Sequence, residues 1–308
     1  MNKLELTNNI KKLSYDLGFD IIGISSSNID NNQSNEYFEK WLNLGYHGSM
    51  KWIENKKEER KNILKYFSDV RSVLSFGFNY YSGSNPPSEN YKISNYAWGD
   101  DYHIVIKEKL YEILSFIKSY NEDMKYRVCV DTSPIMEKNW AQNAGLGWIG
   151  KHTNLINKNL GSWFFLGEIL IDLDLEYDQP FLEDLCGTCV KCIDACPTDA
   201  LLPYTLDSNK CLSYLTIEHR GEIPDKYSNK LEGWIYGCDI CQDVCPWNLK
   251  FSKLSDEKRF FKREDIKSME DKDWDKLTKE DYLEIFKKSS AKRTGYKGLI
   301  RNISLNKK

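Results

Sequence analysis

The sequence feature that most constrains this chain is a run of four cysteines within residues 186–197, with the spacing C-x2-C-x2-C-x3-C-P. This spacing is typical of bacterial iron–sulfur proteins with two clusters, in which three thiolates hold one cluster and the fourth binds the other. The run therefore predicts a second group of cysteines elsewhere. Cys238, Cys241 and Cys245 form such a group, and a proline again follows the last cysteine.

The second group is one cysteine short. Ile235 occupies the position where its first cysteine should stand, and Cys211 is available as a substitute. If the two runs share ligands in the bacterial manner, each site receives four thiolates, and eight of the nine cysteines are used. The predicted first site consists of Cys186, Cys189, Cys192 and Cys245, and the predicted second site consists of Cys196, Cys211, Cys238 and Cys241.

Two other uses of cysteine fit this pattern less well. Zinc ribbons also contain C-x2-C pairs, but they need neither a third thiolate two residues farther on nor a Cys-Pro pair that occurs twice. Disulfides are typical of secreted chains, and the charged N-terminal residues lack the continuous apolar stretch of a signal peptide. The pattern therefore favours two iron–sulfur clusters.

Length and charge limit the possible functions. The cluster unit needs only about residues 180–250 of the 308, so the segment before it is far longer than an electron carrier requires. The formal net charge of −3 argues against a globally basic nucleic-acid binder, although it allows a local basic patch. No segment approaches the roughly 18 continuous apolar residues of a membrane span, so we expect no membrane partner. We predict a cytoplasmic protein, because clusters and free thiolates favour a reducing compartment.

Apolar spacing predicts an N-terminal domain over residues 1–175 in which helices and strands alternate, of the α+β (α/β-like) class. A bacterial two-cluster ferredoxin-like domain is expected over residues 176–252, and a short, helical, basic segment over residues 253–308. The expected helices include residues 3–18, 36–44 and 102–120, and the expected strands are residues 21–25, 69–81, 126–130 and 162–171.

Asp131 stands at the predicted junction between a strand and a helix that starts near Pro134 and runs through Ala144. Proline suits the first turn of a helix, and an aspartate just before it could be an N-cap. Asp131 could also be a functional carboxyl group at the end of a strand, where ligands bind in open α/β sheets, and serve as a general acid. Cys129, two residues earlier, is more typical of a core cysteine than of a nucleophile.

A second polar group opens the predicted helix at residue 102. Asp100 or Asp101 could cap this helix. The order Asp-Tyr-His resembles the D-x-H-x-x-G signature by which some cobalamin proteins supply a histidine to cobalt, but Ile106 stands where that signature has glycine. The sequence therefore does not support cobalt ligation by His103, which could still line a polar pocket.

Gly145, Gly147 and Gly150 match a G-x-G-x-x-G string. They follow a predicted helix and not a strand, so they lack the context of a dinucleotide-binding fingerprint. Two alternatives remain. The glycines could let the backbone approach a large flat ligand, with Lys151 and His152 as polar contacts to that cofactor. They could instead form only a tight turn.

Taken together, these segments resemble the epoxyqueuosine reductase family. The resemblance covers most of residues 45–302 and rests on residues 98–103, 131–138, 145–153, 161–168, the first cysteine run and residues 237–248. It implies a cobalamin-dependent enzyme with two four-iron four-sulfur clusters. Such an enzyme reduces the epoxide of epoxyqueuosine, at the wobble position of tRNA, to the alkene of queuosine.

The resemblance also implies site residues. The family's general acid corresponds to Asp131, and electrons pass from the two clusters to cobalamin. The cobalamin pocket is expected to include Arg60, Ser94 and Asp131, together with Cys238 and Asp239 beside a cluster. A protonated Asp131 at neutral pH requires a raised pKa, which a desolvated pocket could supply.

The expected partners are the anticodon region of a tRNA and an external low-potential electron donor, and we expect a monomer. Residues 287–308 contain basic residues and no acidic ones, which suggests either a solvated end or a contact with the RNA backbone. Family members often carry a helical-repeat extension after a segment like residues 291–302, and we expect it to be absent. Two alternatives stay open: a corrinoid iron–sulfur reductase of another substrate, similar to the dehalogenases, or an electron-transfer protein.

Overall fold

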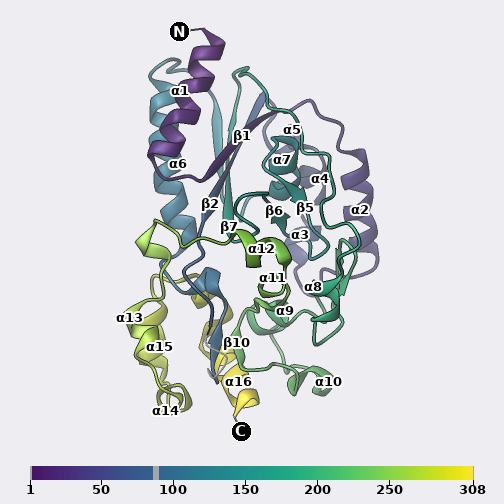
Figure 1. The fold of residues 1–308 in the computed structure, drawn as a ribbon, viewed down its shortest axis with the longest axis vertical. Coiled ribbons are helices and arrows are strands. Elements are labelled where there is room, and N and C mark those ends of the chain that lie inside the picture. The colour runs from purple at the N-terminus through teal and green to yellow at the C-terminus, as the bar shows by residue number, and fades with distance from the viewer. Residues whose placement is uncertain (1, 86–89, 308) are drawn as a thin grey trace.

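The computed structural model describes residues 2–85 and 90–307 and contains a four-stranded sheet in the upper half of Figure 1. The strand order is β1-β2-β7-β4, and every neighbouring pair is antiparallel. Each predicted strand is present, with slightly different ends. The strands of this sheet are β1 (Ile21–Ser26), β2 (Ser72–Asn79), β4 (Tyr126–Cys129) and β7 (Phe164–Ile171).

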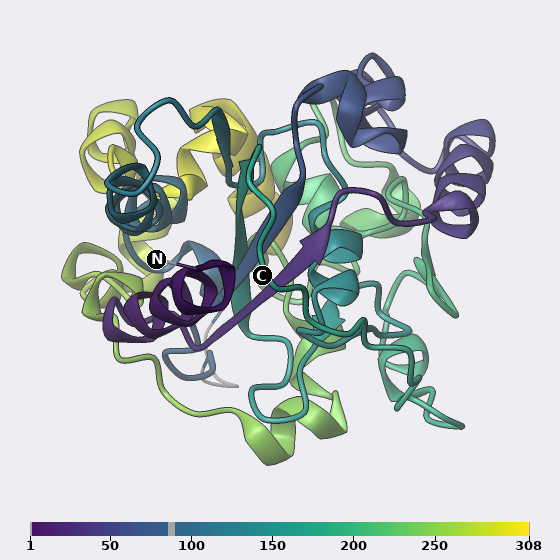
Figure 2. The same cartoon turned by 90° about the horizontal axis from the view of Figure 1, so that it is seen from above.

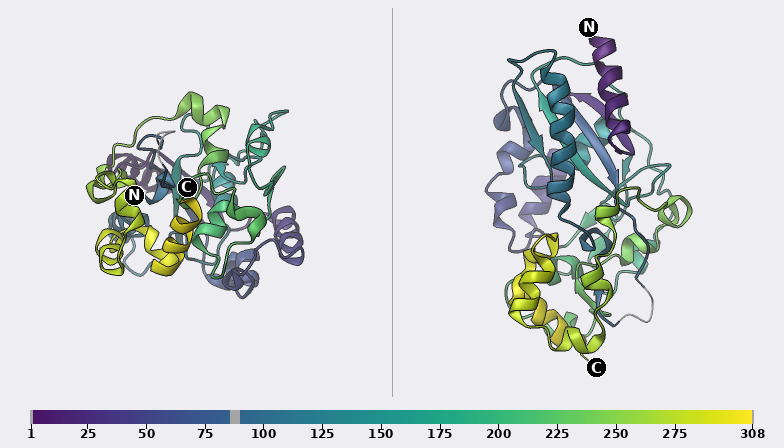
Figure 3. Two further views of the ribbon diagram at one scale, coloured as in Figure 1. Left: turned by 90° about the horizontal axis from the view of Figure 1, so that it is seen from below. Right: turned by 90° about the vertical axis from the view of Figure 1, so that its left-hand side faces the viewer.

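Helices cover both faces of this sheet. Helices α1 (Lys3–Asp16) and α6 (Tyr102–Lys118) lie side by side on one face (Figures 2 and 3). Helix α7 (Glu137–Asn143) packs against β1, β2 and β7 from the other face. Nearly every side chain of the central strands β2 and β7 is therefore buried, which explains why apolar residues outnumber polar ones in both strands. The core on the α1 and α6 side includes Ile10, Leu74, Phe76, Ile106, Leu110, Ile113 and Ile169.

The predicted helix over residues 3–18 is confirmed. Asn2 and Glu5 form a capping box at its start, and Gly18 has a left-handed φ of 93° just after its end. The helix predicted from residue 36 is α2 (Asn32–Asn43), which begins earlier. Asparagine and serine favour caps and turns over helix interiors, so the sequence gives no helix signal for the polar first turn of α2.

The mixed helix and strand content of the predicted α+β class is confirmed, but two finer predictions were wrong. The sheet is antiparallel, so the α/β-like description does not hold, and no row of parallel strand ends creates a binding edge. The segment that contains Pro134 is also not helical, because α7 begins at Glu137 with Met136 as its N-cap. Asp131 is therefore not the N-cap of that helix.

Close backbone packing requires glycine at two positions of the G-x-G-x-x-G string, Gly145 and Gly147. A side chain on Gly145 would lie 2.6 Å from the carbonyl oxygen of Gln179, and one on Gly147 would lie 2.0 Å from that of Ile156. Gly145 also has a φ of 82°. The tight-turn alternative therefore explains this string, and the expected approach of a flat ligand to these glycines is not needed.

The remaining described elements of the first half surround the sheet or lead into the cysteine segment. Residues 51–66 form short helices on the α7 side, and the small strands after α7 precede β7 in the chain. Their bounds are α3 (Lys51–Glu54), α4 (Lys57–Lys61), α5 (Ile63–Tyr66), β3 (Lys92–Ile93), η1 (Asn95–Ala97), β5 (Trp148–Ile149) and β6 (Leu155–Ile156).

The cysteine segment consists of short helices and small strands, as a unit organised by metal ligands requires. Strand β10 (Trp234–Tyr236) pairs in parallel with β3 from the first half of the chain. The segment is therefore tied to the N-terminal half by backbone hydrogen bonds. Its other elements are α8 (Lys191–Asp194), β8 (Leu201–Leu202), β9 (Thr205–Leu206), α9 (Leu212–Ile217), α10 (Asp225–Ser228), α11 (Ile240–Asp243) and α12 (Pro246–Phe251).

The C-terminal segment is helical, as predicted, and shares a core with earlier residues. Tyr91, Ile93 and Trp98 pack with Phe286 and Leu299 in one buried cluster. Within residues 2–85 and 90–307, no helix is long and apolar enough to span a membrane. The C-terminal elements are η2 (Lys258–Phe260), α13 (Glu264–Lys267), α14 (Asp271–Asp275), α15 (Lys279–Phe286), η3 (Ser290–Thr294) and α16 (Gly295–Asn306).

The packing of α7 against β1 yields a stability prediction. A side chain on Gly23 of β1 would lie 1.9 Å from the carbonyl oxygen of Ala144, so Gly23→Ala must displace backbone. We expect it to lower the free energy of unfolding by roughly 1–3 kcal/mol, measured by urea denaturation. The control is Gly221→Ala, whose new side chain would meet only His219 atoms at 3.5 Å or more. Equal stability of the two variants would contradict this account.

Candidate functional site

Asp131 follows β4 where the chain leaves the sheet, and its backbone has a φ of 60°. Left-handed backbone is uncommon outside glycine, although aspartate adopts it more readily than most residues. Such conformations persist only when their surroundings hold them, and they often occur at functional sites. Because Asp131 does not cap α7, its side chain is available for another role.

Two neighbouring side chains of α6 hold the Asp131 carboxylate. Its Oδ2 atom accepts a hydrogen bond from the hydroxyl of Tyr102 at 3.1 Å and lies 3.3 Å from Nε2 of His103. Nδ1 of His103 lies 2.7 Å from Oδ1 of Asp101, which is the predicted N-cap of α6. Nζ of Lys292 lies 3.1 Å from the same Asp101 carboxylate. The four charged side chains therefore alternate in sign.

This arrangement sets the protonation states. Burial opposes a charge on His103, but its hydrogen bonds to Asp101 and Asp131 raise its pKa to about 9. Desolvation in the cavity raises the pKa of Asp131, but the hydrogen bond and charge of His103 outweigh it and hold that pKa below its usual value. At neutral pH the proton therefore resides on His103. The expected raised pKa of Asp131 is wrong for this structure, because the imidazolium beside it stabilises the carboxylate.

Asp131 lies where two cavities meet. The larger, of about 690 Å³, is lined by residues from α6 and the C-terminal segment, and the smaller, of about 280 Å³, by residues of β7 and α7 and by Gln242 of α11. Both include Tyr96, Tyr102 and Asp131. The larger cavity is also lined by Trp52, His103, Lys107, Glu218, Lys292 and Arg293, and the smaller by Tyr80, Glu137, Lys138, Asn154, Phe165 and Gln242.

Arg60 supports the loop that follows Asp131. Its guanidinium donates to the carbonyl oxygens of Ser133 at 3.4 Å and Ile135 at 3.3 Å, and it lies 5.4 Å from the ring centre of Trp52. These contacts connect α4 to the segment between β4 and α7. Arg60 thus shapes the Asp131 loop from behind, and its predicted contact with cobalamin stays a prediction.

Ser94 and Asp239 are brought together, but inside the protein. The hydroxyl of Ser94 donates to the Asp239 carboxylate, and the backbone N–H of Asn95 donates to the same carboxylate at 2.8 Å. Both side chains are buried. This pair fastens the residues after β3 to the loop that carries Cys238. Neither residue lines the two cavities at Asp131, so their role in binding cobalamin also stays a prediction.

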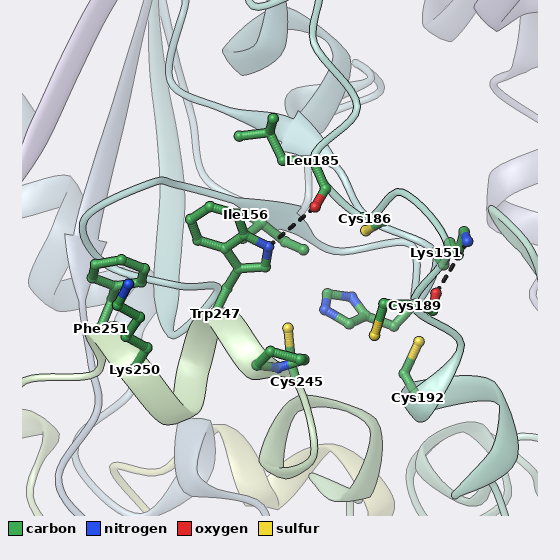
Figure 4. A pocket seen from close by; sticks show the side chains of 12 residues that line it. Lys151, Ile156, Leu185, Cys186, Cys189, Cys192, Cys245, Trp247, Lys250 and Phe251 are labelled. Carbon is green, nitrogen blue, oxygen red and sulfur yellow. Dashed lines mark hydrogen bonds between the residues drawn. The ribbon is translucent and has the colours of Figure 1, made fainter.

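The four cysteines predicted for the first cluster surround one cavity of about 340 Å³ (Figure 4). Their sulfur atoms face this shared space. Lys151 and His152 also line it, and Nζ of Lys151 donates to the carbonyl oxygens of Gly187 at 2.6 Å and Cys189 at 3.0 Å. Lys151 therefore lies at this cysteine cavity and is not among the residues that line the cavities at Asp131, and its predicted contact with cobalamin stays a prediction.

His152 adds a polar atom to the same cavity. Burial, followed by the charge of Lys138, lowers the pKa of His152 to about 4, so the imidazole is neutral. Its Nε2 atom has no hydrogen-bond partner among the described residues. A buried polar atom of this kind requires a partner in the functional protein. A cluster sulfur in the cavity could accept a hydrogen bond from it.

The second set of cysteines also converges. Burial, followed by proximity to Cys211, raises the pKa of Cys241 well above its usual value. Burial and then Cys241 do the same for Cys238, and burial and then the thiol of Cys196 act on Cys211. Cys211 and Cys238 also pack against the same buried apolar cluster. Cys211 therefore lies near the second group, and its role as the substitute ligand stays a prediction. Cys129 instead lies in the sheet, fully buried.

The spacing of the cysteines differs from that of a single-ion site. Among the described residues, no group of three or more His, Cys, Asp or Glu side chains is placed to hold one metal ion. The first four cysteines instead enclose the 340 Å³ cavity. This arrangement fits a group larger than one tetrahedral zinc ion.

Several functional residues were not singled out from the sequence. Glu137 accepts a hydrogen bond from the backbone N–H of Asp131 at 2.6 Å, and Glu168 lies behind it with none of its surface exposed. An acid in the middle of the apolar strand β7 is a signal that could have identified Glu168. The sequence indicates Lys292 and Arg293 only as members of the basic segment 287–308, because only folding brings the C-terminal segment to α6.

Two family models match the chain. Residues 60–132 match the model "Epoxyqueuosine reductase QueG, DUF1730", and residues 185–248 match the "4Fe-4S double cluster binding domain". An epoxyqueuosine reductase from Leadbetterella byssophila is 45% identical over 298 residues, covering 97% of each chain. One from Cyclobacterium marinum is 47% identical and covers 96% of this chain and 94% of its own. This chain belongs to the epoxyqueuosine reductase family.

Solved structures agree with this family assignment. A selenomethionine-labelled epoxyqueuosine reductase superposes with a TM-score of 0.90 at 28% identity, covering 99% of this chain and 82% of that one. An epoxyqueuosine reductase with an epoxyqueuosine-modified tRNA-Tyr stem loop superposes with a TM-score of 0.89 at 27% identity, covering 99% and 81%. A Bacillus subtilis epoxyqueuosine reductase, with a TM-score of 0.87 at 27% identity and coverage of 99% and 82%, has an aspartate-bearing catalytic loop swung out of the active site.

The convergence of Cys211 with the second group yields a test of its ligand role. Two four-iron clusters hold about eight iron atoms per chain. We expect Cys211→Ala to lower the iron content after anaerobic reconstitution to about half and to leave one cluster. Cys129→Ala is the control, because Cys129 lies in the sheet, and it should keep the full iron content. Full iron content in Cys211→Ala would show that Cys211 is not a ligand.

Proposed function

We propose that this chain reduces the epoxide of epoxyqueuosine at the wobble position of tRNA to the alkene of queuosine. Its membership of the epoxyqueuosine reductase family supports this reaction. The observation that carries the proposal is the Asp131 carboxylate, held by Tyr102 and protonated His103 where two cavities meet. The same family membership favours this function over the dehalogenase-like and electron-carrier alternatives.

The chemistry defines what the protein must supply. Conversion of an epoxide into an alkene breaks both carbon–oxygen bonds of the ring. It consumes two electrons and two protons and releases one water molecule. The residues around Asp131 can hold and move protons, while the two 4Fe-4S clusters, when bound, supply electrons one at a time.

We assign proton delivery to Asp131 together with His103. Because the pKa of His103 is about 9 and that of Asp131 is lowered, the proton starts on Nε2 of His103 at neutral pH. A nucleotide that fills the cavity excludes water, which favours the neutral form of a carboxyl group. Transfer from His103 to Oδ2 of Asp131 then produces a carboxylic acid that can protonate the departing oxygen. Asp101 and Lys292 hold His103 in orientation from the other side.

The residues that would hold cobalamin line the two cavities at Asp131. Tyr96 lines both cavities, and Asn154 and Gln242 line the smaller one, where their amide groups would lie against the cofactor. His103 is engaged with two carboxylates, so it is not free to bind cobalt. When bound, cobalamin would supply a low-potential cobalt centre that transfers electrons to the substrate.

We propose that the tRNA approaches over the larger cavity. Lys107, Lys292 and Arg293 line it, and basic side chains bind RNA phosphates. Arg293 forms a two-point ion pair with Glu218, and Arg301 donates to backbone carbonyl oxygens of Leu215 and His219. Much of the basic charge in the C-terminal segment is thus also used within the protein.

We propose an external low-potential donor as the source of the electrons, because the reduction consumes two electrons and the residues around Asp131 supply only protons. We propose a monomer that acts in the cytoplasm.

The assigned role of Asp131 yields a test. Asp131→Asn keeps the shape of the side chain but cannot donate a carboxyl proton. We expect turnover of epoxyqueuosine in tRNA to fall by about 10²–10⁴-fold, measured by the queuosine content of the tRNA, while the visible spectrum of bound cobalamin is unchanged. Asp123→Asn, at an exposed position before β4, is the matched control. Full turnover by Asp131→Asn would refute the general-acid assignment.

The raised pKa of His103 yields a pH prediction. His103 carries its proton below a pH of about 9 and loses it above, so kcat should fall as the pH rises through about 9. Asp101→Asn removes a carboxylate that raises this pKa, and asparagine is also a good helix N-cap. The fall in kcat should therefore shift to lower pH in that variant, measured as a pH–rate profile. An unshifted profile would exclude His103 as its source.

A further inference from the structure

Two glutamates meet inside the protein behind Asp131. Glu168 lies on β7 with none of its surface exposed, and no group of another described residue donates a conventional hydrogen bond to either of its oxygens. Helix α7 packs against β7, and the Glu137 carboxyl group of α7 lies close enough to raise the pKa of Glu168. Two carboxyl groups can form a hydrogen bond with each other only if one of them carries a proton. The burial of Glu168 and the lack of a donor to its oxygens therefore favour a proton at this pair.

Glu137 connects the pair to the reaction site. Its Oε1 atom accepts the hydrogen bond from the backbone N–H of Asp131 at 2.6 Å, and it lines the smaller cavity. Arg60 holds the carbonyl oxygens of Ser133 and Ile135 on the same loop. The left-handed backbone of Asp131 is thus supported on one side by Glu137 and farther along by Arg60.

The charges around the pair favour its neutral form. Burial, followed by the charge of Asp131, raises the pKa of Glu137 to about 8. Burial, followed by Glu137, raises the pKa of Glu168 well above its usual value. Arg60 partly offsets this effect on Glu137. The titratable groups that face the pair from the elements packed against it are Arg60, Tyr102, Cys129, Asp131 and Lys138.

We propose that Glu137 and Glu168 share one proton and that this buried carboxyl pair positions the Asp131 loop, residues 131–135, for proton delivery. The inference rests on the proposed function and adds two positioning residues to it. With the proton in place, Glu168 donates to Glu137, and the other oxygen of Glu137 holds the backbone N–H of Asp131. If both glutamates ionise, their repulsion adds to that of Asp131, and the support for the loop weakens.

A purely structural role would not explain the choice of residue. A buried carboxyl group without a donor is costly to a fold, and leucine would pack at this position of a sheet without that cost. Glu168 therefore makes sense as the proton-bearing partner of Glu137. Unlike Glu137, Glu168 does not line the cavities, so its substitution tests the pair without removing a wall of the site.

The first test compares Glu168→Leu with Glu168→Gln in the reconstituted protein with both clusters. Glutamine keeps a donor to Glu137, and leucine removes it. We expect amide hydrogen exchange of residues 131–135, measured by mass spectrometry, to rise about three- to tenfold in Glu168→Leu and to stay near the wild-type value in Glu168→Gln. The control is Glu176→Gln at the surface. If leucine and glutamine give the same exchange, whether slow or fast, the pair does not position the loop.

Turnover gives a second measurement on the same variants. A displaced Asp131 should lower kcat by roughly tenfold to a hundredfold in Glu168→Leu, with little change in the KM for tRNA because Glu168 does not reach the cavities. Glu168→Gln should restore most of kcat. A change in KM alone, or a loss that glutamine does not restore, would overturn the positioning role.

The shared proton has its own readout. Infrared spectra at pH 7 should contain the carbonyl band of a protonated carboxylic acid that disappears in the double variant Glu137→Gln/Glu168→Gln. Absence of this band from the wild-type protein would overturn proton sharing. The infrared and exchange measurements need no substrate, so they test the pair even if the chain fails to reduce epoxyqueuosine. Failure of the proposed function would instead appear as absent turnover in the wild-type protein.

Discussion

Strand β7 forms antiparallel hydrogen bonds with β2 on one side and with β4 on the other, and the position of the candidate site depends on this pairing. The register places Cys129 opposite Glu168, so β4 ends beside the buried acid of β7. The chain must then turn away from the sheet at Asp131. Helix α6 packs against β7, and its first residues, Tyr102 and His103, meet the Asp131 carboxylate at that end of the sheet.

Neighbouring side chains of opposite charge stabilise one another around Asp131. A lone carboxylate beside a cavity would favour its neutral form, but the alternation of Lys292, Asp101, His103 and Asp131 lets each charge stabilise the next. The consequence is that the proton starts on the imidazole and not on the aspartate. Behind Asp131 the opposite condition holds, because burial and the charge of Asp131 outweigh the compensation that Arg60 and the Asp131 N–H give to Glu137. At one end of the sheet, the pKa of Asp131 is thus lowered while the pKa values of Glu137 and Glu168 are raised.

The C-terminal segment contributes to this site as well as to the fold. Ser290, Lys292 and Arg293 line the larger cavity, while α16 packs against β10 and α9. Asn302 donates to the backbone carbonyl oxygens of Thr216 and Ile235, and its side chain is fully buried. These contacts join the C-terminal segment, which lines the Asp131 cavity, to α9 and β10 of the cysteine segment. Basic residues that look like a simple charged tail in the sequence are therefore partly structural.

The sequence by itself determined the features that depend on local spacing. The cysteine run and its partner predicted two sets of four thiolates, including Cys211, because ligand spacing follows the geometry of a cluster. Apolar periodicity predicted helices such as α1 and α6 and the strands of the sheet. The motif around Asp131 identified the acid through its resemblance to a family. Only the tertiary structure decided strand direction, the protonation of Asp131, the place of Lys151 at the first cysteine cavity and the pairing of Glu137 with Glu168. Each of these depends on residues far apart in the chain, whose distances and mutual charges exist only after the sheet and helices have packed.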